Sequence, residues 1–418
     1  MATPKFLECN LCGNQQPYEP FVPAVCKKCE SQWLEARYDY EAFKREILRG
    51  LPNRPSNMWR YQDILPLNNP SALDLYPAGG TPLWLSHRFA PALGHDSVYL
   101  KDERYGSTSS FKDRQAAGAV AAMLENGIKE AVIASTGNAA VAYAAACARA
   151  GIKLWVFMTS LVPQEKLREA ALFGAEVIRV SGNYDQTKQI AAQFAQRKNL
   201  LLDRGATSVP AREAMKTIAY EIVEQLGWRT PDQVVIPMAS GSLLTKIWKG
   251  LHEMRTVGLI DDVRTKINGA QAEGCSPIST AFKAGRDFFK PVKPKTIAKS
   301  LAIGNPADGY YALKATAESK GSMDMVSDEE VVEGIKLLAQ TEGIFAETAG
   351  GVTIGVLQKL VKQGTIKKTD VTVAYITGNG LKTQEAVIDA VGRPHRIQPS
   401  LVSFEQTFKV GKYGSGDA

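Results

Sequence analysis

The sequence is poor in histidine, and this scarcity limits the chemistry that the chain can perform. Among 418 residues there are four histidines, His87, His95, His252 and His395, and none lies near a serine motif or a glycine-rich turn. Nucleophilic triads that depend on histidine, and histidine-rich metal sites, are therefore poorly supplied. Lysine is the obvious alternative base for any proton chemistry.

Long apolar runs are also lacking. No segment approaches the ~20 uninterrupted apolar residues that span a bilayer, since even the most apolar region, residues 131–162, contains charged residues. The first residues, MATPKFLECN, lack the apolar core of a signal peptide. With 44% hydrophobic and 22% charged residues, the composition excludes a disordered chain or a fibre. We therefore expect a soluble cytoplasmic protein without a membrane partner.

Strong charge of one sign is absent as well. The net charge of +7 is spread along the chain, with no long basic run and no interleaving of basic and aromatic residues. This excess suits anionic small molecules as well as nucleic acid, so no nucleic-acid partner is expected. The motifs GxGxxG after a strand and GxxxxGK[ST] are missing too, which disfavours a nicotinamide enzyme and a P-loop.

Two CxxC pairs stand within the first 50 residues. Cys9 and Cys12 form one pair, and Cys26 and Cys29 form the other after thirteen intervening residues. Two such turns can offer four thiolates in the tetrahedral arrangement that zinc prefers, and a closed four-thiolate site has a structural role. Two redox dithiols, or a decayed site, remain the alternatives. The spacing predicts a zinc-ribbon-like segment over residues 1–50.

From about residue 97 onward, short β-branched segments alternate with amphipathic ones. Strands are predicted at 98–103, 131–135, 232–240 and 371–378, and helices at 110–127 and 138–151, with one long helix from 209 to 227. This alternation predicts an α/β fold on mainly parallel sheets. In such folds ligands gather where strands end and helices begin, so the junctions between them are examined for chemistry.

The first junction holds a lysine at the start of a predicted helix. Hydroxyl residues in STSSFKDR can cap that helix, which places Lys112 in its first turn. A cation there opposes the helix dipole, and the penalty lowers the pKa of the lysine, as a nucleophilic amine requires. The alternative is an exposed lysine whose charge Asp113 partly offsets.

The second junction, ASTGNAA, precedes an alanine-rich helix. Its polar residues Ser135, Thr136, Gly137 and Asn138 face a helix N-terminus, whose free N–H groups attract a carboxylate or a phosphate. Ordinary capping of the helix by serine or threonine explains the same residues equally well.

Two further junctions follow strands later in the chain. The third can cradle a phosphate with backbone amides and two hydroxyls: Ala239, Ser240, Gly241, Ser242 and Leu243. The fourth, ITGNGLK, presents the neutral hydroxyl of Thr377 at the end of a strand. Taken singly, a tight turn accounts for either one. An activated lysine, a carboxylate-binding turn, a phosphate cradle and a neutral hydroxyl are together the parts of a pyridoxal phosphate site.

These junctions resemble the type II fold of pyridoxal phosphate enzymes, the tryptophan synthase beta-like family, and within it the threonine synthases. SFKDR resembles the cofactor-lysine motif, which makes Lys112 the Schiff-base residue, and ASTGNAA resembles a substrate loop whose Asn138 contacts the cofactor ring hydroxyl. PMASGSLLTKIWKG resembles the phosphate cradle, and ITGNGLK assigns Thr377 to the pyridine nitrogen. The segments AKSLAIGNPADGYYAL and TEGIFAETAGG resemble threonine synthases more than dehydratases.

The resemblance implies an architecture. We expect two three-layer α/β domains with mainly parallel sheets, preceded by the zinc-ribbon-like segment. The catalytic region is expected over residues 51–395, with a smaller subdomain at about 110–205 and a larger one made from the remainder. A loose tail is expected over residues 396–418.

The implied activity is that of a carbon–oxygen lyase acting on phosphates. O-phospho-L-homoserine and water would give L-threonine and phosphate, the last step of threonine biosynthesis, with pyridoxal 5'-phosphate as cofactor and Lys112 as mobile base. Arg204, Arg212 and Lys216 are candidates for the substrate phosphate, although solvated helix charges are the usual explanation. A homodimer is expected. The alternatives are a threonine/serine dehydratase or another β-replacing enzyme, and a non-catalytic zinc-ribbon binding protein.

Overall fold

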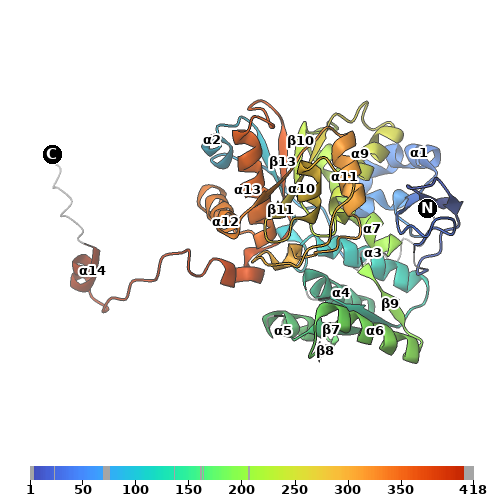
Figure 1. Cartoon of the computed structure of the whole chain (residues 1–418), viewed down its shortest axis with the longest axis horizontal. Helices are drawn as coiled ribbons and strands as arrows, with labels where there is room; N and C mark the ends of the chain where they lie inside the picture. Colours follow the sequence, from blue (N-terminus) through green and yellow to red (C-terminus); the bar gives the residue numbers. More distant parts are fainter. Residues whose placement is uncertain are drawn as a thin grey trace.

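The computed structural model describes residues 4–22, 24–68, 76–135, 137–160, 162, 164–205 and 208–408. Within these residues the strands form three sheets, of three, six and four strands. Figure 1 shows the four-stranded sheet at the bottom, the six-stranded sheet above it and the N-terminal segment at the right. The chain therefore has the α/β architecture with two main sheets that its sequence predicts.

The N-terminal segment is a small antiparallel sheet. Its strand order is β2-β1-β3, formed by β1 (Phe6–Cys9), β2 (Gln15–Gln16) and β3 (Leu34–Arg37). Two turns that carry the cysteine pairs flank these strands, and α1 (Tyr40–Gly50) follows. With so little secondary structure of its own, the segment depends on its contacts with the rest of the chain.

The larger sheet has the order β12-β11-β10-β13-β5-β4, and only β4 runs antiparallel to its neighbour. Its strands are β4 (Leu83–Leu85), β5 (Val98–Asp102), β10 (Gln233–Pro237), β11 (Lys266–Ala272), β12 (Met323–Val326) and β13 (Thr372–Ile376). Because β5, β13 and β10 are parallel neighbours, the loops that follow them emerge side by side at one edge.

Helices cover both faces of the larger sheet, as the side-chain alternation along its strands requires. In β10, Val234 and Ile236 belong to the apolar cluster that includes α9, whereas Val235 belongs to the cluster that includes α13. The helices of this region are α2 (Phe89–Ala92), α8 (Thr217–Gln225), α9 (Ser242–Thr256), α10 (Pro277–Lys283), α11 (Gly309–Glu318), α12 (Asp328–Glu342) and α13 (Thr348–Lys362).

The smaller sheet is entirely parallel, with the order β8-β7-β6-β9. Its strands are β6 (Glu130–Ala134), β7 (Lys153–Thr159), β8 (Glu176–Val180) and β9 (Leu201–Asp203), and its helices are α3 (Lys112–Glu125), α4 (Asn138–Ala150), α5 (Gln164–Leu172) and α6 (Tyr184–Lys198). Ala131 and Ile133 of β6 face the core that includes α3 and α4, and Val132 faces α6. This unit is therefore three-layered as well.

The single helix predicted from 209 to 227 is divided in the structure. It forms α7 (Val209–Met215) and α8, which meet at Lys216. Lys216 keeps helical dihedral angles, but α7 packs against α3 while α8 packs against α9. The division therefore lets one stretch of chain contact both main units.

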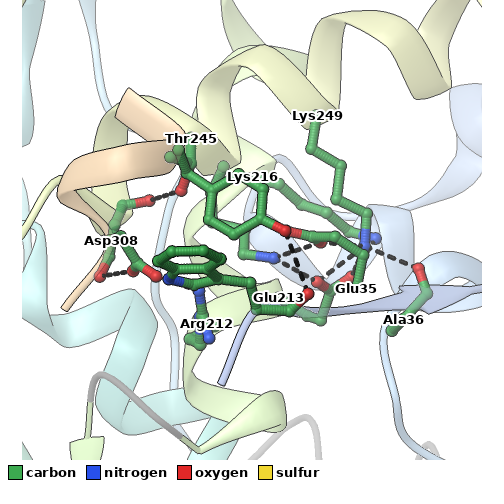
Figure 2. Close-up of polar contacts among 12 residues, drawn as sticks. Glu35, Ala36, Arg212, Glu213, Lys216, Thr245, Lys249 and Asp308 are labelled. Atoms are coloured by element: carbon green, nitrogen blue, oxygen red, sulfur yellow. Dashed lines mark hydrogen bonds and ion pairs between the residues drawn. The ribbon is translucent and has the colours of Figure 1, made fainter. Parts of the chain in front are cut away.

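A cluster of six charged side chains, which we call the buried ion cluster, anchors the N-terminal segment. Its members are Glu35, Glu213, Glu253, Lys216, Lys246 and Lys249. Glu35 of β3 lies 2.5 Å from the Nζ of Lys246 and 3.2 Å from that of Lys249, and Lys249 also donates to the carbonyl of Ala36 at 2.8 Å (Figure 2). Burial raises the pKa of Glu35, but the two lysines outweigh burial and hold it at about 2. The segment is thus held by charge as well as by apolar packing.

The described part of the chain ends in an arm that projects from the body (Figure 1). Figure 1 shows α14 (Leu401–Phe408) far to the left, at the end of an extended stretch. None of the residues of α14 is buried, including Leu401, Val402 and Phe404. In the part of the chain that the structure describes, no helix is both long and apolar enough to cross a membrane.

Candidate active site

Lys112 is the first residue of α3, where its sequence motif predicts it. The N-cap is Phe111, and it makes no side-chain capping bond, so the expected hydroxyl cap does not form. Instead, the Asp113 carboxylate accepts from the amide of Thr108 at 2.9 Å and from its hydroxyl at 2.6 Å. Ser109 adopts a left-handed φ of 60° and thereby turns the chain tightly into the helix.

The amine of Lys112 is partly buried and only lightly held. Its Nζ donates to Gln115 Oε1 at 2.9 Å and lies 4.5 Å from the ring centre of Phe111. Burial lowers the pKa of Lys112 to about 8, against an opposing effect of the Glu347 carboxylate. The direction agrees with the prediction, but the main cause is loss of solvation rather than the helix dipole. A neutral, nucleophilic amine is therefore accessible near neutral pH.

The loop before α3 is tied to the loop after β13. The Phe111 amide donates to the Thr377 carbonyl at 3.0 Å, and the Asn379 amide donates to the Ser109 carbonyl at 3.0 Å. Between them, Ser110 and Gly378 form an antiparallel bridge. The structure thus brings the buried Thr377 next to the segment that carries Lys112.

Asn138 begins α4 and reaches the same place from the smaller sheet. Its Nδ2 donates to Glu347 Oε2 at 2.9 Å, and that oxygen would lie 2.4 Å from a Cβ added at Gly378. Glu347 is the N-cap of α13, and burial raises the pKa of its carboxyl group, with Lys166 and Asn138 opposing. The sequence analysis missed Glu347, although it falls within the TEGIFAETAGG segment and directly precedes a helix.

Two lysines that the sequence analysis also missed lie near Glu347. Lys166 Nζ is 3.9 Å from Glu347 Oε1, and Lys382 Nζ is 3.2 Å from Glu169 Oε1. Both lysine side chains are mostly buried, and both lower the pKa of Glu347. Lys382 belongs to the ITGNGLK motif, so its position beside the junction was available from the sequence.

The predicted substrate turn is only partly described. Ser135 follows β6 and its amide donates to the Phe157 carbonyl at 3.1 Å, while Gly137 is the N-cap of α4. Thr136 lies outside the described residues. The side chain of Ser135 does not cap the helix in the usual way, since α4 has no side-chain capping bond.

The predicted phosphate cradle opens α9. Gly241 has a φ of 90°, and a Cβ there would lie 2.9 Å from the Asp308 carbonyl oxygen, so only glycine fits. The hydroxyls of Ser240 and Ser242 are 2.9 Å apart, and Ser242 also bonds to the Asp308 carboxylate. Since Ser242 and Leu243 begin the helix, their N–H groups have no acceptor within it. Ala239, before the turn, is partly buried against the core.

The three cations predicted for the substrate phosphate go to different places. Arg212 is buried and its Nη2 donates to Asp308 Oδ1 at 2.6 Å, beneath the cradle (Figure 2). Lys216 is fully buried in the buried ion cluster, 2.8 Å from Glu213 and 2.9 Å from Glu253, and has no exposed nitrogen to offer a substrate. Although Arg212 and Lys216 are four residues apart, their side chains bind different partners and do not form one phosphate site.

Arg204 is exposed and lines a different hollow. A pocket of about 450 Å³ lies between the N-terminal segment and α6, with Val25, Lys188 and Leu202 among its walls. Of the predicted site residues that the structure describes, only Arg204 lines it. The structure does not bring Arg204 together with Lys112.

The four cysteines of the N-terminal segment converge. Cys9 and Cys29 have their Sγ atoms 3.6 Å apart, Cys12 and Cys26 have theirs 3.7 Å apart, and all four lie within 4.8 Å of one another. A zinc ion bonded to four thiolates at about 2.3 Å sets the sulfur atoms about 3.8 Å apart. The cluster therefore has the dimensions of a four-thiolate zinc site.

Several buried polar atoms around Lys112 make no hydrogen bond within the described part of the chain. They include Asn138 Oδ1, Ser110 Oγ and Glu347 Oε1. Unpaired buried polar atoms are costly, so they indicate groups prepared for a ligand. These groups fit a pyridoxal phosphate molecule. They provide the amine of Lys112 with its lowered pKa, the free N–H groups at the start of α9, where only glycine fits at position 241, and the buried hydroxyl of Thr377.

Comparison of the sequence with known proteins leads to the same cofactor. The family profile described as "Pyridoxal-phosphate dependent enzyme" matches residues 75–378. Threonine synthase of Methanocaldococcus jannaschii is 38% identical over 96% of this chain and 98% of its own length. Threonine synthase of Methanosarcina acetivorans is 34% identical over 94% of this chain and 96% of its own.

Solved structures show the fold alone. The processed form of threonine deaminase isoform 2 from Solanum lycopersicum superposes with a TM-score of 0.63 at 19% identity, covering 90% of this chain and 97% of that one. Such a low identity says nothing about the reaction. It establishes that the two packed α/β units form a shared framework.

Proposed function

This chain belongs to the pyridoxal-phosphate dependent enzymes and, within them, to the threonine synthases; we propose that it converts O-phospho-L-homoserine and water into L-threonine and phosphate. It is a lyase of amino-acid biosynthesis. The site assignment rests on one observation. Lys112, whose pKa is lowered, lies at the start of α3, close to Asn138 at the start of α4 and to Thr377 after β13. We place the reaction in the cytoplasm and expect a homodimer.

The residues divide the work of holding the cofactor. Lys112 is the residue that would hold it covalently, Asn138 would face its ring hydroxyl and Thr377 its ring nitrogen. The amides and hydroxyls from Ala239 to Leu243 would bind its phosphate. When bound, pyridoxal phosphate supplies an electron sink for carbanion charge. Thr377 has a neutral hydroxyl, which does not force the ring nitrogen to stay protonated as a carboxylate would.

Proton transfer would fall to Lys112 whenever its amine is free. A free amine whose pKa lies near 8 can take the proton from Cα and return it at neighbouring carbons, since its pKa is close to the operating pH. The Ser135–Gly137 turn at the start of α4 would orient the substrate carboxylate, with the helix dipole favouring the negative charge. Glu347 then fixes the side-chain amide of Asn138.

The substrate's phosphate needs cations, and the structure favours a set different from the predicted one. Lys166 pairs with Glu347, which accepts from Asn138, and Lys382 pairs with Glu169; both lysines lower the pKa of Glu347. We propose that these two lysines bind the leaving phosphate. Lys216 is not carried into the proposed site, because its partners are all in the buried ion cluster, and Arg212 is assigned to the cradle.

The four cysteines are proposed to hold one structural zinc. A closed four-thiolate site leaves no position for a substrate, so the metal would stabilise the N-terminal segment and take no part in the reaction. The support for this proposal is the convergence of the four sulfur atoms.

The test is the product formed from O-phospho-L-homoserine by the purified holoenzyme. Equal amounts of phosphate and threonine are expected, and the protein should absorb visible light. Formation of 2-oxobutyrate in place of threonine would assign a dehydratase. A colourless protein without turnover would eliminate the proposal.

Lys112→Ala tests the central residue. It should abolish turnover and the cofactor that borohydride fixes to the chain, because the covalent link is lost. Lys129→Ala is the matched control, since Lys129 is exposed at the end of the same helix–strand unit and should change neither. Retention of fixed cofactor in Lys112→Ala would show that the lysine is misassigned.

A further inference from the structure

The N-terminal segment touches the loop that supports the phosphate cradle. Trp33, just before β3, donates its indole Nε1–H to the Ala307 carbonyl at 3.0 Å. Its ring stacks on Tyr310 with centroids 4.7 Å apart, and Tyr311 donates its hydroxyl proton to the Trp33 carbonyl at 3.0 Å. Two hydrogen bonds and a stacked ring pair therefore fix the start of α11 against this segment.

Asp308, the residue after Ala307, connects that contact to the cradle. Its amide donates to the Ser240 carbonyl at 2.9 Å, and its carboxylate bonds to Ser242 Oγ on one oxygen and Arg212 Nη2 on the other. Its own carbonyl lies against Gly241, where it excludes any side chain. Asp308 is buried, so a shift of the 307–308 backbone would move Ser240, Gly241 and Ser242.

These contacts determine which acceptor each hydroxyl of the cradle donates to. An ionised carboxylate only accepts, so Ser242 must donate its single proton to Asp308. The hydroxyl of Ser240, 2.9 Å from Ser242 Oγ, then donates to it. Ser240 is therefore the hydroxyl that can turn its proton from Ser242 toward a phosphate, while the proton of Ser242 stays on Asp308.

A carboxylate beside a phosphate site would repel the ligand if it were alone. Arg212 lies 2.6 Å from Asp308 and offsets its charge, and the pKa of Arg212 is raised by Asp308 although its burial acts in the opposite direction. The pair therefore holds the Ser242 hydroxyl without adding net negative charge near the ligand.

We propose that Trp33 and Asp308 are positioning residues for the cofactor phosphate, so that the N-terminal segment takes part in cofactor binding. Trp33 holds the Ala307–Asp308 backbone, and Asp308 sets the orientation of the Ser240–Ser242 turn. This inference rests on the proposed function, which places pyridoxal phosphate in the cradle. Neither residue touches the reacting atoms, and their effect is confined to the phosphate end of the ligand.

The experiment titrates the cofactor-free full-length chain with pyridoxal phosphate and, separately, with pyridoxal, which lacks the phosphate. Trp33→Phe keeps an aromatic ring for the stacking on Tyr310 and removes the indole N–H together with the five-membered ring. Loss of one hydrogen bond corresponds to about a three- to tenfold increase in the dissociation constant. We expect that increase for pyridoxal phosphate and no change for pyridoxal, with the apoprotein still unfolding in a single thermal transition.

Trp248→Phe is the matched control, because Trp248 lies on α9 and donates to Glu318 on the protein surface rather than to the cradle loop. It should leave both dissociation constants unchanged. A double-mutant cycle of Trp33→Phe with Ser242→Ala should be non-additive for pyridoxal phosphate, since both act on the same turn. Ser242→Ala, which removes the hydroxyl that Asp308 orients, provides a second variant and should also weaken only the phosphate-bearing ligand.

Unchanged binding of pyridoxal phosphate by Trp33→Phe, or an equal loss for both ligands, would overturn the inference, as would strict additivity in the cycle. A wild-type chain that binds neither ligand would instead overturn the proposed function. The two failures are therefore distinguishable in one set of titrations.

Discussion

The backbone amide of Phe111 donates a hydrogen bond to the carbonyl of Thr377 at 3.0 Å, and this contact fixes the start of α3 against the end of β13. The two residues lie far apart in the sequence. Because Lys112 follows Phe111 directly, the contact sets the position of the amine relative to the Thr377 hydroxyl. The two loops are thus joined by a main-chain bond, which does not depend on the side chains of Phe111 and Thr377.

The attachment of the cofactor should depend on pH in a way that reports the pKa of Lys112. With a pKa of about 8, about one amine in ten is neutral at pH 7, against about one in three thousand at the ordinary value of 10.5. The rate at which visible absorbance develops after mixing apoprotein with pyridoxal phosphate should therefore rise up to about pH 8 and then level off. A rate that keeps rising to pH 10 would contradict the assignment.

Replacing Glu347 by glutamine should shift that profile toward lower pH. The carboxylate raises the pKa of Lys112, so removing its charge lets the pKa fall below about 8. Glutamine keeps an oxygen for the Asn138 amide, which isolates the effect of charge. The same mixing experiment, run over a range of pH, measures the shift.

Glu342→Gln is the control for this effect of charge. The Glu342 carboxylate accepts from the amides of Arg88 and Phe89, on the outer side of the larger domain. Its profile should match that of the wild type. A Glu347→Gln profile that coincides with the control would show that Glu347 does not act on the lysine.

Arg114→Ala should destabilise the chain strongly. Arg114 is fully buried and bonds through Nε to Glu103 at 2.8 Å and through Nη1 to Glu221 at 2.6 Å. Removing one partner of a buried ion pair leaves uncompensated charge, at a cost of about 3–5 kcal/mol. The midpoint of urea unfolding should fall accordingly, whereas that of Arg149→Ala, at an exposed position on α4, should move by less than a quarter as much.

Purified protein should contain about one zinc ion per chain, measured by elemental analysis. Cys12→Ser should lower that content and reduce the thermal stability of the N-terminal segment, because the fourth thiolate is lost. Cys147→Ser should keep the metal, since Cys147 is buried within α4, away from the cluster. A full zinc content in Cys12→Ser would contradict the proposal that all four cysteines bind the metal.

The sequence predicted the elements whose apolar pattern is strong. β5, β6, β10 and β13 and the helices between them fall where periodicity places them, because each buries a continuous face. β4 and β9 have three residues each, too few to show a pattern. The division at Lys216 was not foreseen because α7 and α8 share one continuous amphipathic pattern, and only their different packing partners separate them.

Lys112 and Asn138 could be predicted as site residues because each is a reactive or polar residue at a junction between a strand and a helix. Glu347 and Asp308 were missed because an acidic residue at the start of a helix is ordinary in itself. Their roles come from partners distant in sequence: Asn138 for Glu347, and Ser242 with Arg212 for Asp308. Lys216 was predicted to bind the substrate phosphate from its spacing to Arg212, but tertiary packing places it in the buried ion cluster.

The balance of three positive and three negative groups in the buried ion cluster constrains how the protein can be engineered. A shortened version that starts after residue 50 would delete Glu35 and leave three lysines, Lys216, Lys246 and Lys249, with two carboxylates as counter-ions. Truncation alone should therefore lower the stability of the remaining chain. A workable minimal catalytic unit would need an uncharged, similarly long side chain, such as methionine, at position 246.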